Sequence, residues 1–186
     1  MKKVGMLLIA GLLVACLPLS AQKFSLSTDL IGYAFFGTVN AEACVSVSQK
    51  WSLTAGARVN PFTFRKADPA RQFQFRQQSY ALGARMWPWH TGSGWWFAGK
   101  MRYQEYNRGG LFLNDTREGD RFGAGIYAGY THMLTAHLNL EFGLGLWAGM
   151  DMYRKYSCPK CGTVTSSGKA GFILPDDAMI SIAYVF

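Results

Sequence analysis

The heptapeptide YSCPKCG at residues 156–162 places Cys158 and Cys161 at the C-x-x-C spacing found in metal and redox centres. A structural zinc site normally needs four Cys or His ligands, and this segment supplies two. A thioredoxin-like centre needs the pair at the start of a helix in a βαβ unit, which the sequence lacks. In an oxidising compartment we expect a disulfide that tightens a loop. A metal knuckle completed by a second chain and two free thiols are the alternatives.

Three histidines, His90, His132 and His137, are the other residues that could take part in proton transfer. A general base must lie within hydrogen-bond reach of the proton that it removes. His90 and His137 fall in short polar turns, and His132 lies close to one. No serine is expected to face any of them. We therefore expect no catalytic residue, no cofactor and no bound metal.

The elements that hold these residues begin after an export signal. Lys2 and Lys3 precede an apolar stretch at residues 4–15, which is too short to span a bilayer, and small residues then allow cleavage after Ala21. In the alternative reading, LVAC is a lipoprotein box that ends at Cys16. Both readings place residues 22–186 in an oxidising compartment. Loss of Lys2 and Lys3 lowers the formal charge of +8 by two, to +6, and export argues against nucleic acid as the partner of this basic chain.

Apolar residues alternate with polar ones and glycines along most of the chain, which is the period of a β-strand. In LNLEFGLGLWAGMDMY, the even positions from Leu138 to Met150 are apolar, and the odd positions carry Glu141, Asp151 and several glycines. We predict eight strands, at residues 24–33, 41–47, 51–60, 78–87, 95–106, 120–134, 138–153 and 177–186. Their connections alternate between short turns and longer loops, a pattern typical of an antiparallel up-and-down transmembrane β-barrel with periplasmic termini.

A soluble β-barrel or sandwich would also alternate, but it would direct its apolar face inward. Here the polar face combines charge with glycine, which suits a narrow lumen, and the apolar face is broad and rich in leucine. Five of the six tryptophans also fall near the short turns and predict an aromatic girdle at one membrane interface: Trp51, Trp87, Trp89, Trp95 and Trp96. The C-terminal strand with its final Phe186 resembles the signal that outer-membrane assembly machinery reads. We therefore favour the membrane barrel.

An eight-stranded barrel has an interior that side chains just fill. The predicted alternation places acids and bases in this interior, where they must pair because a buried unpaired charge is costly. The expected lumenal network contains Asp29, Glu42, Arg58, Arg85, Lys100, Arg102 and Glu141. Arg121 and Asp151 share the same face, but we expect them at strand ends in water. Cys44 is expected to face the lumen as a lone thiol.

Two predicted external loops, at residues 61–77 and 154–176, are basic. Their cations are Arg65, Lys66, Arg71, Arg76, Arg154, Lys155, Lys160 and Lys169. Basic side chains at this level can pair with lipid phosphates, arginine in a bidentate manner. In the first loop, Phe73 and Phe75 could instead extend the following strand above the membrane.

Several segments together resemble a known family, called domain of unknown function 3575. They are KYSCPKCG, the terminal FILPDDAMISIAYVF, and WSLTAGARVNPFTF at residues 51–64. The resemblance covers nearly the whole chain after the signal. It implies a small exported barrel without an established activity, more distantly similar to the eight-stranded OmpA-type barrels.

These observations predict a cleaved signal peptide at residues 1–21 and an all-β, eight-stranded outer-membrane barrel at residues 22–186, in the cell envelope of a Gram-negative bacterium. We expect a non-enzymatic structural or surface-interaction role. The expected partners are outer-membrane lipid, lipopolysaccharide and another envelope protein. One alternative is an exported soluble barrel or lipoprotein that binds a small apolar ligand. A lipid-modifying outer-membrane enzyme is the less favoured alternative.

Overall fold

The computed structural model describes residues 24–64, 73–109, 116–157 and 162–186. In these ranges it contains one short helix and nine strands: β1 (Phe24–Asp29), α2 (Leu30–Ala34), β2 (Val39–Ser46), β3 (Trp51–Asn60), β4 (Thr63–Phe64), β5 (Phe73–Met86), β6 (Gly94–Gly109), β7 (Thr116–Met133), β8 (Leu138–Tyr156) and β9 (Val164–Val185). No helix within this part of the chain is long and apolar enough to cross a membrane.

The strands close into a single antiparallel barrel. Each pairs with its neighbours along the chain, and β1 pairs with both β2 and β9, which joins the two ends of the sheet. The two-residue β4 follows β3 and pairs with β5 beside it, so the closed wall has eight strands. The predicted all-β, eight-stranded, up-and-down barrel is therefore confirmed.

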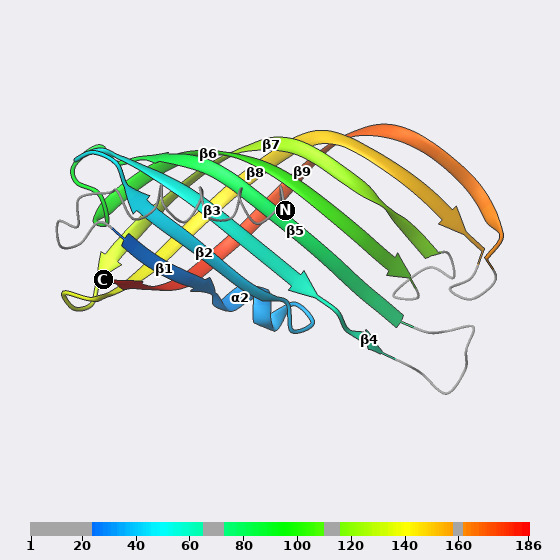
Figure 1. The fold of residues 1–186 in the computed structure, drawn as a ribbon, viewed down its shortest axis with the longest axis horizontal. Helices are drawn as coiled ribbons and strands as arrows, with labels where there is room; N and C mark the ends of the chain where they lie inside the picture. The colour runs from blue at the N-terminus through cyan, green and yellow to red at the C-terminus, as the bar shows by residue number, and fades with distance from the viewer. Residues whose placement is uncertain (1–23, 65–72, 110–115, 158–161) are drawn as a thin grey trace, which may run out of the picture.

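Several strands are longer than the sequence predicts. The predicted strand at 51–60 coincides with β3, but β9 begins at Val164 rather than at residue 177, and β5, β6, β7 and β8 each extend farther toward the long-loop end. In Figure 1 these strands reach well beyond β1, β2 and α2. Most of the predicted loops at 107–119 and 154–176 is therefore strand. We call the extended parts of β5–β9 the outer arm.

Alternation separates an inner face from an outer face along every wall strand. On β6, the even positions Trp96, Lys100 and Arg102 are buried and the odd positions Trp95 and Met101 are exposed. The register of β8 against β9 shifts between Gly143 and Gly145 of β8, which indicates a β-bulge on β9. The one extra residue on β9 reverses its alternation, so that even positions face inward before the bulge and odd positions after it.

Aromatic rings fill the lumen near the short turns at residues 47–50, 87–93 and 134–137. Trp87, Trp96 and Tyr127 are buried there and pack together with Ala98 and Met179. Glycines on the facing strands make room for these rings. A Cβ at Gly145 would lie 2.1 Å from the Tyr127 ring, and one at Gly129 would lie 2.3 Å from the Trp96 ring. The glycines that alternate with apolar residues in β7 and β8 therefore serve packing in the interior.

Candidate functional site

The inner network consists of Glu42, Arg85, Lys100 and Glu141, which four different strands direct into the lumen. Arg85 donates to Glu141 at 3.0 Å and to Glu42 at 2.6 Å, and Lys100 donates to the second oxygen of Glu42. Arg85 is only 1% exposed. Two cations thus meet two carboxylates, and the network is neutral as a unit.

Aromatic rings and a hydroxyl complete the surroundings of the inner network. The Arg85 guanidinium carbon lies 4.2 Å from the Trp96 ring centroid, and Thr131 donates to Glu141 at 3.3 Å. Lys100 lies 5.1 Å from the centroid of Tyr127. The rings exclude water, and they stabilise the cations through their π faces. This arrangement suits a rigid plug of the lumen.

The other residues predicted for the network, Asp29, Arg58 and Arg102, lie beside it around one small cavity. Asp29 caps α2, because its carboxylate accepts from the backbone N–H groups of Ile31 and Gly32 at 3.2 Å each. Arg58 and Arg102 border a small internal cavity of about 20 Å³ next to Glu42. Cys44, a free thiol, lies on β2 and is half-buried.

Toward the long-loop end lies a second group of charges on the inner face, which we call the outer cluster: Arg108, Arg117, Arg121, Asp151 and Lys155. Asp151 accepts from Arg117 at 2.9 Å, from Arg121 at 3.1 Å and from the Tyr106 hydroxyl at 2.8 Å. Asp151 is 2% exposed. The expectation that Arg121 and Asp151 lie in water at strand ends is wrong, because the outer arm extends the strands past them and Tyr106 covers the carboxylate.

Three members of the outer cluster form a row across adjacent strands. Arg108 on β6 is the register partner of Arg117 on β7, which is in turn the partner of Lys155 on β8. We call Arg108, Arg117 and Lys155 the cation row. The Arg108 guanidinium donates to the neutral side chain of Gln77 at 3.1 Å and lies over the Phe75 ring at 4.5 Å. Burial, together with the charge of Arg121, lowers the pKa of Arg108 to about 10.

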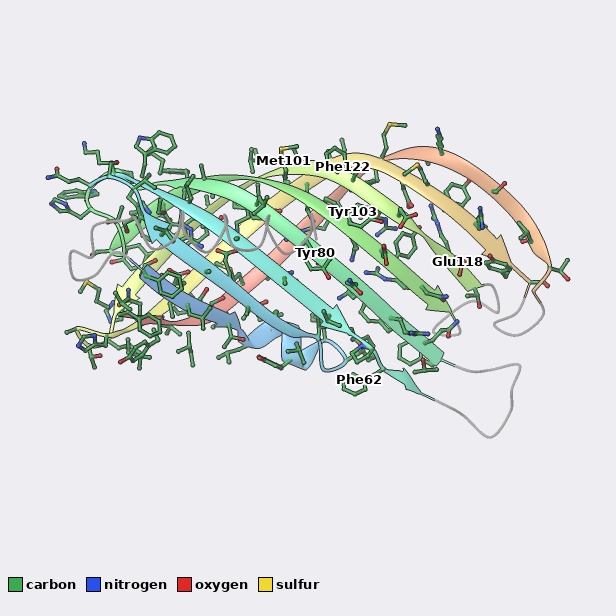
Figure 2. All side chains as sticks on the ribbon, in the orientation of Figure 1. Phe62, Tyr80, Met101, Tyr103, Glu118 and Phe122 are labelled. Atoms are coloured by element: carbon green, nitrogen blue, oxygen red, sulfur yellow. The ribbon has the colours of Figure 1, made fainter. Side chains whose placement is uncertain are left out.

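On the outer face, polar residues begin at one level of the wall. Tyr103 marks this level on β6, and its hydroxyl donates 3.0 Å hydrogen bonds to Glu105 and Asp120. Inside the barrel at this level lies an open cavity of about 810 Å³, bordered on the inner face by the register partners Asn60, Gln77, Tyr106, Gly119, Tyr153 and Gly168. Figure 2 labels Tyr80, Tyr103 and Phe122 near this level. These three residues form a second aromatic girdle, which the sequence analysis did not predict. Each occupies the last apolar outer-face position of its strand before the polar residues begin.

Three of the five tryptophans predicted for the girdle, Trp51, Trp89 and Trp95, are exposed at the short-turn end. Trp87 and Trp96 are each 1% exposed, so their assignment to the girdle is wrong. Trp95 and Trp96 are neighbours on one strand, and neighbours must face opposite sides. Trp87 shares the inner face with Arg85 and donates to Ser52 at 2.9 Å. These two rings fill the lumen.

The basic residues predicted for the external loops separate into three sets. Arg76 and Lys169 lie exposed on the outer face, whereas Lys155 lies on the inner face in the cation row. Arg65, Lys66, Arg71 and Lys160 lie outside the described residues, as do Cys158 and Cys161. Arg108 and Arg117, which the sequence analysis did not assign, fall in a segment that it interprets as loop.

Fold and interior together define a small β-barrel whose lumen is filled by charged and aromatic side chains. The family model described as protein of unknown function (DUF3575) matches residues 6–186. The chain belongs to this family, as the resemblance at residues 51–64 and 155–186 predicts. Searches of the curated proteins and of the solved structures returned no match.

Proposed function

We propose that this chain is an outer-membrane β-barrel that interacts with lipopolysaccharide or with another envelope protein through its outer arm. The observation that carries the proposal is the outer face, where every wall strand exposes a large apolar residue: Leu26, Val39, Leu53, Leu82, Met101, Ile126, Leu144 and Ile182. Ile126 is 73% exposed and Leu144 is 69% exposed. Water-soluble monomers rarely expose an apolar surface that is continuous around the molecule.

The height of this apolar band fits a bilayer. On β6 the outer-face positions are apolar, or glycine, from Trp95 to Tyr103 and polar from Glu105 onward. A membrane-spanning strand needs about 9–11 residues. Trp95 and Tyr103 stand at the two ends of this stretch, where aromatic side chains prefer the membrane–water interfaces. The charged interior supports the same assignment, because a soluble barrel of this size buries apolar side chains inside.

Basic side chains beyond the apolar band support contact with the outer leaflet. Arg76, Arg154 and Lys169 are exposed on the outer face at the level where lipid headgroups would lie. Arginine binds phosphate groups in a bidentate manner, and lysine adds a point charge. We infer that these three side chains hold the phosphates of lipopolysaccharide.

A role without catalysis is part of the proposal. His137 donates from Nδ1 to the Val185 carbonyl at 2.9 Å, and His90 and His132 belong to the same short-turn end. A lipid substrate in the outer leaflet would lie at the other end of the barrel. Release of fatty acid from lipopolysaccharide by the purified chain would contradict this part of the proposal.

Membrane fractionation tests the first part. We expect the chain to sediment with the outer membrane, to resist extraction by carbonate, and to migrate faster on gels when it is not boiled. A chain that is recovered without detergent in the periplasmic fraction would overturn the membrane assignment. For the second part, the triple variant R76Q/R154Q/K169Q should bind lipopolysaccharide in micelles at least tenfold more weakly. The matched triple variant S46A/S48A/T135A, at the opposite end, should bind like the wild type.

A further inference from the structure

The cation row places three positive side chains next to one another on the inner face of the outer arm. Arg108, Arg117 and Lys155 are register partners on β6, β7 and β8. Neighbouring strands lie about 4.8 Å apart. Like charges directly opposite each other destabilise a sheet unless something neutralises them. The row therefore needs negative charge nearby.

The described residues supply little of that charge. Within them, Asp151 is the one carboxylate that contacts the row, and it reaches Arg117 but is shared with Arg121. Among the described residues, the side chain that accepts a hydrogen bond from Arg108 is the neutral Gln77. The outer cluster thus combines four cations with one anion.

The two arginines of the row have donors left to offer. The buried Nε atoms of Arg108 and Arg117 have no hydrogen-bond partner among the described residues. Each guanidinium carbon lies over an aromatic ring, Arg108 at 4.5 Å from the Phe75 centroid and Arg117 at 4.1 Å from the Tyr153 centroid. A guanidinium against a ring face presents its N–H groups at its edge, which is how arginine binds a tetrahedral oxyanion. Lys155, 5.8 Å from the same Tyr153 ring, stands beside Arg117.

We propose that Arg108, Arg117 and Lys155 form a binding site for a phosphate-class oxyanion in the mouth of the barrel. The ligand is either free phosphate in the surrounding solution or a phosphate group carried by a surface sugar. Because the row lies on the inner face, it is distinct from the outer-face cations that we assign to lipid, and the site does not depend on the proposed function.

The test is isothermal titration of the folded, full-length chain in detergent, with sodium phosphate in a chloride buffer of constant ionic strength. We expect saturable binding of one phosphate and a thermal stabilisation that grows with its concentration. At ten times the Kd, the unfolding equilibrium constant should fall about elevenfold. R108M and K155M should each weaken binding at least tenfold. R108K should retain part of the affinity. K50M, a loss of one cation in the exposed turn at the opposite end of the barrel, is the matched control and should bind like the wild type.

Two further experiments identify the ligand and test whether a carboxylate of the chain itself occupies the site. Glucose 1-phosphate that binds more tightly than inorganic phosphate would assign the ligand to a sugar, and weaker binding would assign it to the free ion. The chain's own Asp68 and Asp115 belong to segments outside the described residues. If D68N or D115N raises the affinity for phosphate more than tenfold, the row serves to hold that carboxylate and the proposal is overturned. It is also overturned if wild type and R108M respond equally to phosphate.

Discussion

The inner network and the outer cluster are built from the same residue types on the same inner face, but their charge balance differs. In the inner network, Arg85 and Lys100 are matched by Glu42 and Glu141. In the outer cluster, Asp151 alone is shared by Arg117 and Arg121, while Arg108 has a neutral acceptor. A neutral network can be buried as a finished structural unit. A cluster with excess positive charge calls for an anion from outside.

Access to water differs in the same direction. The Arg85 side chain is 2% exposed and is enclosed by Trp87 and Trp96, whereas the Arg117 side chain is 37% exposed. Salt screens exposed charges and has little effect on buried ones. Removal of one charge should therefore lower the free energy of unfolding strongly and independently of salt in the inner network. In the outer cluster the loss should be smaller and should depend on salt.

Replacement of Arg85 by Met should have the largest effect on stability. It leaves Glu141 without its cation and Glu42 with Lys100 alone, and removal of one partner from a buried ion pair costs about 3–5 kcal/mol. We expect the free energy of unfolding in urea, measured in detergent, to fall by about that amount at both low and high salt. R76M, on the exposed outer face, is the matched control. An R85M chain as stable as R76M would show that the inner network contributes no net stability.

The D151N variant probes the outer cluster in the same way. Among the described residues it removes the one carboxylate that contacts Arg117 and Arg121, but these cations are nearer to water than Arg85 is. We expect a loss of about 2–3 kcal/mol in low salt, below the range for a fully buried pair. Unfolding curves at 20 and 500 mM NaCl should show part of this loss recovered, since screening reduces the repulsion among the remaining cations. A loss independent of salt would remove the distinction between the two regions.

A pair of glycine substitutions tests whether the two regions also differ in packing. A Cβ at Gly145 would lie 2.1 Å from the Tyr127 ring, whereas one at Gly168 in the outer arm would lie 3.3 Å from its nearest neighbour, the Tyr153 hydroxyl. Overpacking a full interior costs about 1–3 kcal/mol. We expect G145A to lose about that much, and G168A to change the free energy of unfolding by less than about 0.5 kcal/mol. Equal losses would mean that the outer arm is packed as tightly as the lumen.

The sequence predicts the barrel and the inner network because both depend on strict alternation within the apolar band. Leu138, Leu140 and Phe142 mark the outer face of β8, so the direction of Glu141 follows from its position alone. The same rule could have corrected the girdle, because Trp95 and Trp96 cannot share a face. The tryptophan assignment relied on closeness to the turns and ignored the alternation.

The outer cluster could not be read from the sequence in the same way. In the outer arm both faces of the sheet are polar, so residues 107–109 and 116–119 carry no apolar alternation and resemble a loop. Arg108 and Arg117 meet only because β6 and β7 continue their register past the apolar band. The bulge opposite Gly143 and Gly145 likewise hides β9, because it reverses the alternation in the middle of the strand.

Replacement of Arg108 by Met should have the smallest effect on stability, and it separates the two regions most sharply. The variant loses a hydrogen bond to Gln77, worth about 1 kcal/mol, but it also removes the repulsion between Arg108 and Arg117. In chloride buffer without phosphate, we expect the free energy of unfolding to change by less than about 0.5 kcal/mol, against the loss of several kcal/mol in R85M. With phosphate present, the wild type should become the more stable of the two, since only it retains the full row. A loss in R108M as large as that in R85M, without phosphate, would mean that Arg108 already has its anion within the chain.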